Sequence, residues 1–148
     1  MSEMLGNQYF MARNYAAAHN EFERVLLKDP CNKLVTKKQI ICYTQIGEIQ
    51  KALTLFHYLV KTDIELIVDT DEIHDDCPCP EIIEQMNNSH ASLFGKEEHL
   101  RLAILWLYCD INESINYFKI SAQEYKESAL IKSILNKLQH YKTSAERN

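Results

Sequence analysis

Two stretches of the chain decide its fold: ARNYAAAHNEF, residues Ala12–Phe22, and IGEIQKALTLF, residues Ile46–Phe56. The second stretch follows the first at an offset of 34 residues, and identical or similarly apolar residues recur at several paired positions. The pairs are Tyr9 with Tyr43, Tyr15 with Ile49, Ala18 with Ala52, and Phe22 with Phe56. A constant offset of this length predicts a repeated structural unit.

A third copy of the pattern, YCDINESINYF, spans Tyr108–Phe118. Its Ile111, Ser114 and Phe118 stand 62 residues after their counterparts in the second copy. This offset is 28 residues longer than one repeat. The third copy is therefore predicted to be a regular repeat that an insertion displaces along the chain.

Each copy has the features of two helices joined by a short turn. In the first copy, apolar residues recur at helical spacing on both sides of a predicted turn at Arg13-Asn14. Pro30 predicts the end of the second helix, because the residue before a proline is disfavoured in the α region. A small residue such as Ala18 lets the helices approach, and the large Phe22 fills the space beside it. One hairpin cannot bury both faces of its helices, so the hairpins are expected to stack.

The composition fits an all-α protein with a single domain, residues 1–148. Only 3 glycines and 3 prolines occur, which argues against a many-turned β-fold and for long helices. No apolar run approaches the roughly 20 residues of a membrane span, and the N-terminal segment does not resemble a signal peptide, so we expect a cytoplasmic protein that binds no membrane. In that compartment the cysteines are expected to be free thiols; they are Cys31, Cys42, Cys77, Cys79 and Cys109.

The net charge of −5 is unevenly distributed along the chain. Residues 63–98 carry 11 acidic residues and one basic residue. The sequence has no basic stripe interleaved with aromatic residues, which argues against nucleic-acid binding. It also has no G-x-S-x-G, P-loop or Gly-rich dinucleotide turn, so we expect neither an enzyme nor a cofactor.

The spacing of the repeats resembles the tetratricopeptide repeat family. The first copy carries the family's L-G, Y, A, F and P at Leu5-Gly6, Tyr9, Ala18, Phe22 and Pro30. The second copy keeps Tyr43, Gly47, Ala52 and Phe56, but has Gln39-Ile40 for L-G and Ile64 for the proline. The third copy keeps Phe118, with Ser114 in place of the alanine and Leu105 in place of the tyrosine.

The resemblance implies a right-handed stack of about three helical hairpins. The hairpins would lie at about residues 3–36, 37–63 and 96–125, with an insertion at about 64–95. A helix at about residues 126–142, apolar on one side and rich in lysine on the others, is expected to cap the stack.

The insertion is predicted to contain a loop and then a helix. Its first residues, IELIV, could prolong the preceding helix or form a short extended segment. The next stretch, DTDEIHDDCPC, has no helical periodicity and predicts a loop. The stretch Pro80–Phe94 predicts a helix with Pro80 at its first position and Glu81 and Glu84 near the positive end of the helix dipole.

The loop contains candidate metal ligands in His74, Cys77 and Cys79, with His90 as a fourth. Structural zinc sites usually pair their cysteines as C-x2-C, whereas a single proline separates these two. The acidic residues do not follow the EF-hand spacing, and thiol redox chemistry has no C-x2-C to support it. We therefore expect a solvated acidic loop with no bound metal, and a metal-responsive binding module is the alternative.

In the tetratricopeptide family, the first helices of successive repeats line a concave groove that holds a peptide or helix of a partner protein. The resemblance places nine residues of this chain in that groove: Asn7, Phe10, Lys37, Lys38, Ile41, Gln45, Lys96, His99 and Trp106. The three lysines would make the groove locally positive, which favours a partner peptide of acidic character. Phe10 and Trp106 could belong to the core instead.

One subset of the family grips the C-terminal carboxylate of chaperone partners with a clamp of Lys, Asn, Asn, Lys and Arg. Asn7 and Lys96 match this clamp, whereas Glu3, Lys38 and Leu100 depart from it. Because Glu3 would repel the carboxylate, we expect no tight binding of chaperone tails.

The expected function is therefore non-enzymatic protein–protein interaction, as an adaptor, an assembly factor or a co-chaperone. A secretion-type chaperone is an alternative, since short three-repeat members of the family also serve there. A short stack with exposed aromatic residues could also form a homodimer through its N-terminal hairpin.

Overall fold

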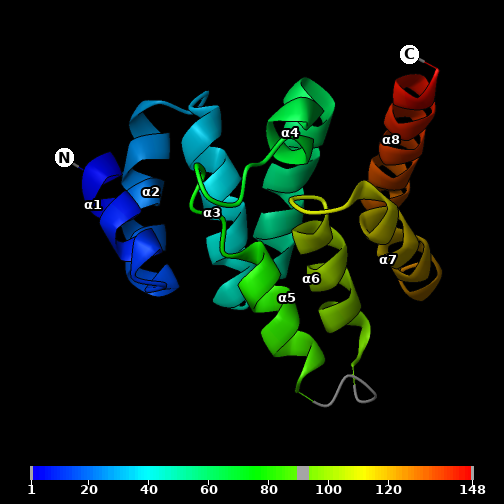
Figure 1. Ribbon diagram of the computed structural model, residues 1–148, viewed down its shortest axis with the longest axis horizontal. Coiled ribbons are helices and arrows are strands. Elements are labelled where there is room, and N and C mark those ends of the chain that lie inside the picture. The colour runs from blue at the N-terminus through cyan, green and yellow to red at the C-terminus, as the bar shows by residue number, and fades with distance from the viewer. Residues whose placement is uncertain (1, 90–93, 148) are drawn as a thin grey trace. The chain divides into compact units, whose positions relative to one another are not determined.

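The computed structural model describes residues 2–89 and 94–147, and these residues form eight α-helices (Figure 1). The helices are α1 Ser2–Met11, α2 Tyr15–Lys28, α3 Lys33–Gln45, α4 Ile49–Val68, α5 Cys79–Asn87, α6 Lys96–Trp106, α7 Ile111–Glu124 and α8 Ala129–Glu146. Five pairs of consecutive helices pack against each other: α1 with α2, α2 with α3, α5 with α6, α6 with α7, and α7 with α8. The prediction of an all-α protein built from sequential hairpins is confirmed.

The chain divides into two compact units between Leu59 and Val60, within α4. The first unit contains α1, α2, α3 and the first part of α4, and the second contains the rest of α4 and the helices after it. Helix α4 is interrupted at Asp63, whose φ of −162° and ψ of 66° lie outside the helical region. The IELIV segment after this interruption is helical, which decides between the two conformations that the sequence allowed. Within the described ranges, no helix has the length and apolarity that crossing a membrane requires.

The repeated small residues and phenylalanines occupy equivalent places in the second helix of each hairpin. Six side chains, Ala18 and Phe22 on α2, Ala52 and Phe56 on α4, and Ser114 and Phe118 on α7, all have 0% of their surface exposed. Ser114 fits the small-residue position because its hydroxyl donates a hydrogen bond of 2.7 Å to the main-chain oxygen of Ala103 on α6. That bond offsets the cost of burying a polar group. The spacing of small residue and phenylalanine therefore identifies the buried face of each second helix.

The helix ends of the first unit follow from local sequence. Arg13, in the turn after α1, has a φ of 62°, and the Asn14 side chain accepts a hydrogen bond from the Ala17 N–H to cap α2. Helix α2 ends at Lys28, two residues before Pro30, as predicted. Gly47, between α3 and α4, has a φ of 83°, which a glycine adopts without steric cost.

The second unit differs from the prediction at helix ends. Helix α5 begins at Cys79, so Pro80 is its second residue rather than its first, and it ends at Asn87. The predicted helical positions His90 and Leu93 lie outside the described residues. Helix α8 begins at Ala129 and continues to Glu146, so the predicted capping helix starts later and ends later than expected. Its start is fixed by the Ser128 side chain, which accepts a hydrogen bond from the Ile131 N–H.

Candidate partner-binding surfaces

Lys38 of α3 reaches across to α1 within the first unit. Its ammonium group donates a hydrogen bond of 2.8 Å to Asn7 Oδ1 and lies 5.9 Å from the centre of the Phe10 ring. A second bond links the same two helices, because Asn32 Nδ2 donates to Glu3 Oε1 at 2.8 Å. The structure thus brings three predicted groove residues together, but the ammonium group already interacts with α1.

Three predicted groove residues of the first unit are buried. Phe10 is 1% exposed, and its ring centre lies 6.0 Å from that of Tyr15 and 6.1 Å from that of Phe22. Ile41 is 2% exposed and Lys37 is 8% exposed. Side chains this deeply buried present little surface to a partner. The other predicted groove residues of this unit are half-buried and expose more of their surface; they are Asn7, Lys38 and Gln45.

The predicted groove residues of the second unit interact with α7 and its C-terminal end. The Lys96 ammonium lies 5.7 Å from the centre of the Tyr125 ring, and His99 Nδ1 lies 2.9 Å from Glu124 Oε1. The His99 ring also neighbours Phe94 and Tyr117, with centres 6.5 Å and 6.3 Å away. Lys96 itself is exposed, so a cationic group remains available at the start of α6.

Trp106, at the end of α6, lies at the edge of a cavity of about 320 Å³. The other lining residues come mainly from α5 and are Pro80, Ile83, Glu84, Asn87, Asn88 and Cys109. The indole Nε1 is buried, and it has no hydrogen-bond partner among the residues that the structure describes. Trp106 is therefore half-buried beside α5. Its exposure is intermediate between that expected of a core residue and that expected of a groove residue, the two roles that the sequence allowed.

The three candidate metal ligands between α4 and the start of α5 differ in exposure. His74 is exposed and its Nδ1 lies 3.0 Å from Asp71 Oδ2, whereas Cys77 and Cys79 are buried. In the described part of the chain, no group of three or more histidine, cysteine, aspartate or glutamate side chains is arranged to hold a metal ion. The remaining candidate, His90, lies outside the described residues.

The pKa values of His74 and Asp71 are shifted by their contact with each other, and this can be tested by titration. Hydrogen bonds from the His74 N–H and ring lower the pKa of Asp71, and the Asp71 carboxylate raises the pKa of His74 above its ordinary value of 6.5. The pair's contribution to loop order is therefore lost when the pH rises through the raised His74 pKa or falls through the lowered Asp71 pKa. We expect Asp71→Asn to return the His74 pKa, followed by its ring proton shifts in NMR, toward 6.5. Asp69→Asn is the matched control, and an equal fall in both variants would contradict the assignment.

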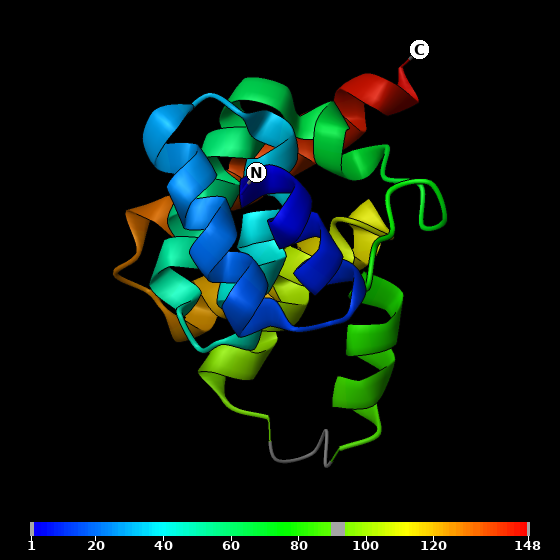
Figure 2. The same ribbon diagram turned by 90° about the vertical axis from the view of Figure 1, so that its left-hand side faces the viewer.

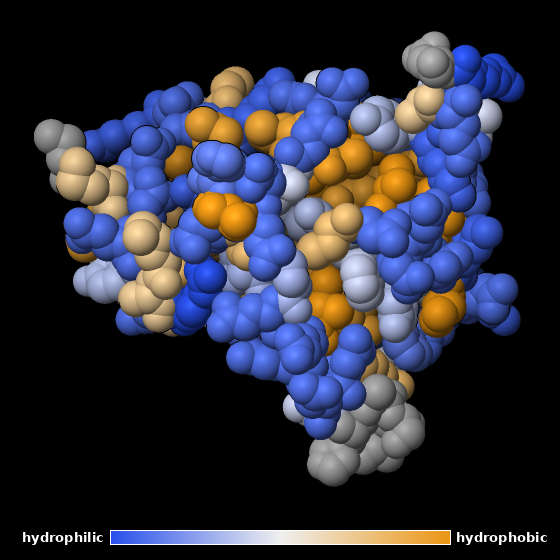
Figure 3. All heavy atoms as spheres, viewed as in Figure 1, coloured by the Kyte–Doolittle hydropathy of each residue, from blue (hydrophilic) through white to orange (hydrophobic). Residues whose placement is uncertain are grey.

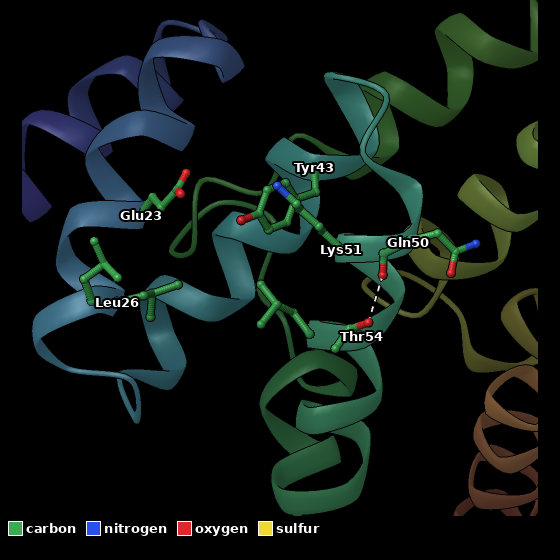
Figure 4. A pocket seen from close by; sticks show the side chains of 8 residues that line it. Glu23, Leu26, Tyr43, Gln50, Lys51 and Thr54 are labelled. Carbon is green, nitrogen blue, oxygen red and sulfur yellow. Dashed lines mark hydrogen bonds between the residues drawn. The ribbon is translucent and has the colours of Figure 1, made fainter.

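An open apolar cavity of about 410 Å³ lies between α2, α3 and α4 in the first unit (Figure 4). Figure 4 shows Glu23 and Leu26 on the α2 side, Gln50, Lys51 and Thr54 on the α4 side, and the Tyr43 ring between them. The remaining two lining residues are Leu27 and Leu55. Leu27 is 79% exposed, although it is one of the most hydrophobic residue types. We call these eight residues the α2–α4 pocket.

Polar groups at the edge of the α2–α4 pocket are held in place by a hydrogen-bonded chain. Gln39 Nε2 lies 3.0 Å from His19 Nδ1, and His19 Nε2 lies 3.1 Å from Glu23 Oε2. This arrangement fits the histidine tautomer that accepts at Nδ1 and donates at Nε2. Burial, and then the negative charge of Glu23, raises the pKa of Tyr43 above its ordinary value.

The prediction of groove residues did not include the α2–α4 pocket, because the family resemblance pointed only to the first helix of each hairpin. A signal for it was present in Val25-Leu26-Leu27, three consecutive apolar residues at the end of α2. Successive residues of a helix point in directions about 100° apart, so all three cannot face one buried side.

Comparisons with known proteins do not identify a binding site, since no family model, curated protein or solved structure matches this chain.

Proposed function

We propose that this chain is a non-enzymatic protein-interaction module with tetratricopeptide-like hairpins, and that it holds a helical segment of a partner protein. The hairpin part of this proposal is supported by the equivalent burial of the small residues and phenylalanines on α2, α4 and α7. It is also supported by the close approach of α1 and α2 at Gly6, the glycine of the L-G pair, where an added Cβ would lie 2.6 Å from the Phe22 ring.

The observation that carries the binding proposal is the α2–α4 pocket. Its lining includes the apolar side chains of Leu26, Leu27 and Leu55, while Glu23 on α2 and Lys51 on α4 carry opposite charges. An apolar depression between two helices fits a single large apolar residue of an amphipathic helix, and charged groups around it would set the orientation of that helix. The Lys51 ammonium lies 5.9 Å from the centre of the Tyr43 ring, which holds it at the edge of the pocket.

The predicted groove positions of each unit, taken unit by unit, are further candidate contacts for a partner. Lys38 of the first unit and Lys96 of the second each lie near an aromatic ring. Lys96 is exposed, whereas Lys38 is half-buried and also donates a hydrogen bond to Asn7. Their charge supports the earlier expectation of an acidic partner segment. A test of the function must therefore separate the α2–α4 pocket from the groove.

The test is affinity capture from the source cell's lysate, with partner proteins quantified by mass spectrometry. Four forms of the chain are immobilised: the wild type, Leu27→Glu, the groove variant Asn7→Ala/Lys38→Glu/Lys96→Glu, and Ile73→Glu. Ile73 is 87% exposed in the acidic loop, so its substitution matches the charge and polarity change at Leu27 away from the pocket.

We expect at least one partner to be retained by the wild type and Ile73→Glu and to fall at least about tenfold with Leu27→Glu, because a partner's apolar side chain would have to desolvate the new carboxylate. Loss from the groove variant alone would move the binding site to the groove. Equal recovery of every protein with all four forms would contradict both surfaces.

A further inference from the structure

Two side chains of opposite charge border the α2–α4 pocket, and each is held by its own contact. On the α2 side, Glu23 Oε2 lies 3.1 Å from His19 Nε2, and the Glu23 side chain is 51% exposed. On the α4 side, the ammonium group of the exposed Lys51 lies 5.9 Å from the centre of the Tyr43 ring. Because each charge has a different partner within the chain, the two charges do not neutralise each other across the pocket.

A buried amide orients the Glu23 carboxylate through His19. Gln39 is 0% exposed, and its Nε2 lies 3.0 Å from His19 Nδ1. When Nδ1 accepts a hydrogen bond from the amide, the ring proton is on Nε2 and is donated to Glu23 Oε2. This bond uses one carboxylate oxygen, so Glu23 Oε1 can accept a hydrogen bond from a cationic group of a partner.

Each wall of the pocket carries its charge one helical turn before a leucine. Leu27 follows Glu23 by four residues on α2, and Leu55 follows Lys51 by four residues on α4. Side chains with this spacing are neighbours on one face of a helix. Figure 4 shows Glu23 and Lys51 toward the upper end of the pocket. The pocket therefore has two opposite charges at one end and leucine side chains a turn further along.

Helix α1 leaves the pocket side of α2 accessible. Figure 2 shows α1, in dark blue, beside α2, in lighter blue, and the two helices pack against each other. At the left of Figure 3, where Figure 1 places these helices, hydrophobic and hydrophilic side chains lie next to one another. The Glu23 side chain is nevertheless 51% exposed and Leu27 is 79% exposed. A partner can therefore contact both the charge and the leucine.

We propose that the α2–α4 pocket selects a partner helix that carries a basic and an acidic residue one turn away from its large apolar residue. The apolar residue contacts Leu27 and Leu55, the basic residue meets Glu23, and the acidic residue meets Lys51. Positions three and four residues before a given side chain lie on either side of it, so one helix can present both charges. This inference rests on the proposed function, because it specifies the partner of the same pocket.

The pair of opposite charges separates this partner from other apolar partners. A segment with two acidic residues at these positions would be attracted by Lys51 and repelled by Glu23, and a segment with two basic residues would meet the reverse. The carboxylate of Glu23 also disfavours the surface of an anionic membrane. The pocket therefore differs in its preference from the lysines at the groove positions, which favour an acidic segment.

Designed peptides test the inference by NMR. Each peptide has an alanine-based helical sequence of about 16 residues with one central leucine, a length at which such a sequence populates a helix in water. The peptides differ only at the positions three and four residues before the leucine. Two mixed peptides carry one lysine and one glutamate there, in either order; a basic peptide carries two lysines and an acidic peptide two glutamates. Dissociation constants come from the methyl shifts of Leu27 and Leu55 in the isotope-labelled full chain.

We expect one mixed peptide to bind the wild type at least about threefold more tightly than the basic and acidic peptides, an effect typical of exposed ion pairs. Glu23→Lys should change the preference to the acidic peptide, and Lys51→Glu should change it to the basic peptide. The matched controls are Glu127→Lys and Lys126→Glu, at exposed positions in the turn before α8, which should keep the wild-type preference. Salt at about 1 M should weaken every preference, because it screens exposed charges.

The outcomes distinguish failure of this inference from failure of the proposed function. Leu27→Glu should raise the dissociation constant of every peptide at least about tenfold, which tests the pocket itself. Binding that depends on Leu27 but shows no charge preference, or a preference that neither charge reversal changes, would overturn the inference and leave the proposed function standing. Methyl signals that no peptide shifts, or equal binding by Leu27→Glu and the wild type, would overturn both.

Discussion

Phe22→Ala should lower the free energy of unfolding by about 3–5 kcal/mol, the cost of removing a fully buried phenylalanine and leaving a cavity. Phe22 is 0% exposed, and its ring lies against Phe10 and against the backbone of α1 at Gly6. The surrounding helices cannot collapse fully into the vacated space, because their separation is set by other contacts between α1 and α2. Urea unfolding followed by circular dichroism measures the effect.

The matched control for Phe22→Ala is Leu27→Ala on the same helix. Leu27 is 79% exposed, so its truncation should change the free energy of unfolding by no more than about 0.5 kcal/mol. The two substitutions remove apolar side chains five residues apart and differ mainly in burial. A loss below about 1.5 kcal/mol for Phe22→Ala, or similar losses for both variants, would show that the phenylalanine of the repeat does not fill the core in the way described.

The fold could largely be predicted from the sequence because each hairpin repeats the same local solution. The spacing of Ala18 and Phe22 identified the buried face of α2, and Pro30 and the Arg13-Asn14 turn identified its ends. These signals are local: a small residue, a large one a turn later, and a helix-breaking residue. The start of the helix in the insertion was predicted one residue too late, since Pro80 is compatible with either of the first two helical positions.

The candidate sites were harder to predict because the burial of α3 does not follow amphipathic periodicity. Thr36, Lys37, Gln39 and Thr44 are all buried, although their side chains are polar. Periodicity assigns such residues to a solvated face, and the family resemblance assigned Lys37 to an open groove. The polar side chains that bridge helices, such as Lys38 with Asn7, lie 31 residues apart and leave no local signal.

Gly6→Ala should also destabilise the chain, although alanine is intrinsically a better helix former than glycine by about 1 kcal/mol. A Cβ at position 6 would lie 2.6 Å from Cε1 and 2.7 Å from Cδ1 of Phe22, and 3.3 Å from the Cβ of Glu21. Because Phe22 is fully buried, its ring cannot move aside without displacing its neighbours. Overpacking of this kind costs about 1–3 kcal/mol, and the better helix propensity of alanine offsets about 1 kcal/mol of that cost, so we expect a net loss of up to about 2 kcal/mol in urea unfolding.

The steric origin of that loss can be isolated by a double-mutant cycle with Phe22→Leu. Leucine lacks the aromatic ring that the new Cβ would meet, so Gly6→Ala should cost less in the Phe22→Leu background than in the wild type. We expect a favourable coupling energy of about 1 kcal/mol or more, within the range found for residues in direct contact. Strictly additive effects would place the cost of Gly6→Ala elsewhere than in the contact with Phe22. A smaller cost of Gly6→Ala in the Phe22→Leu background would instead indicate that the glycine of the L-G pair lets α1 lie directly against the phenylalanine of the repeat.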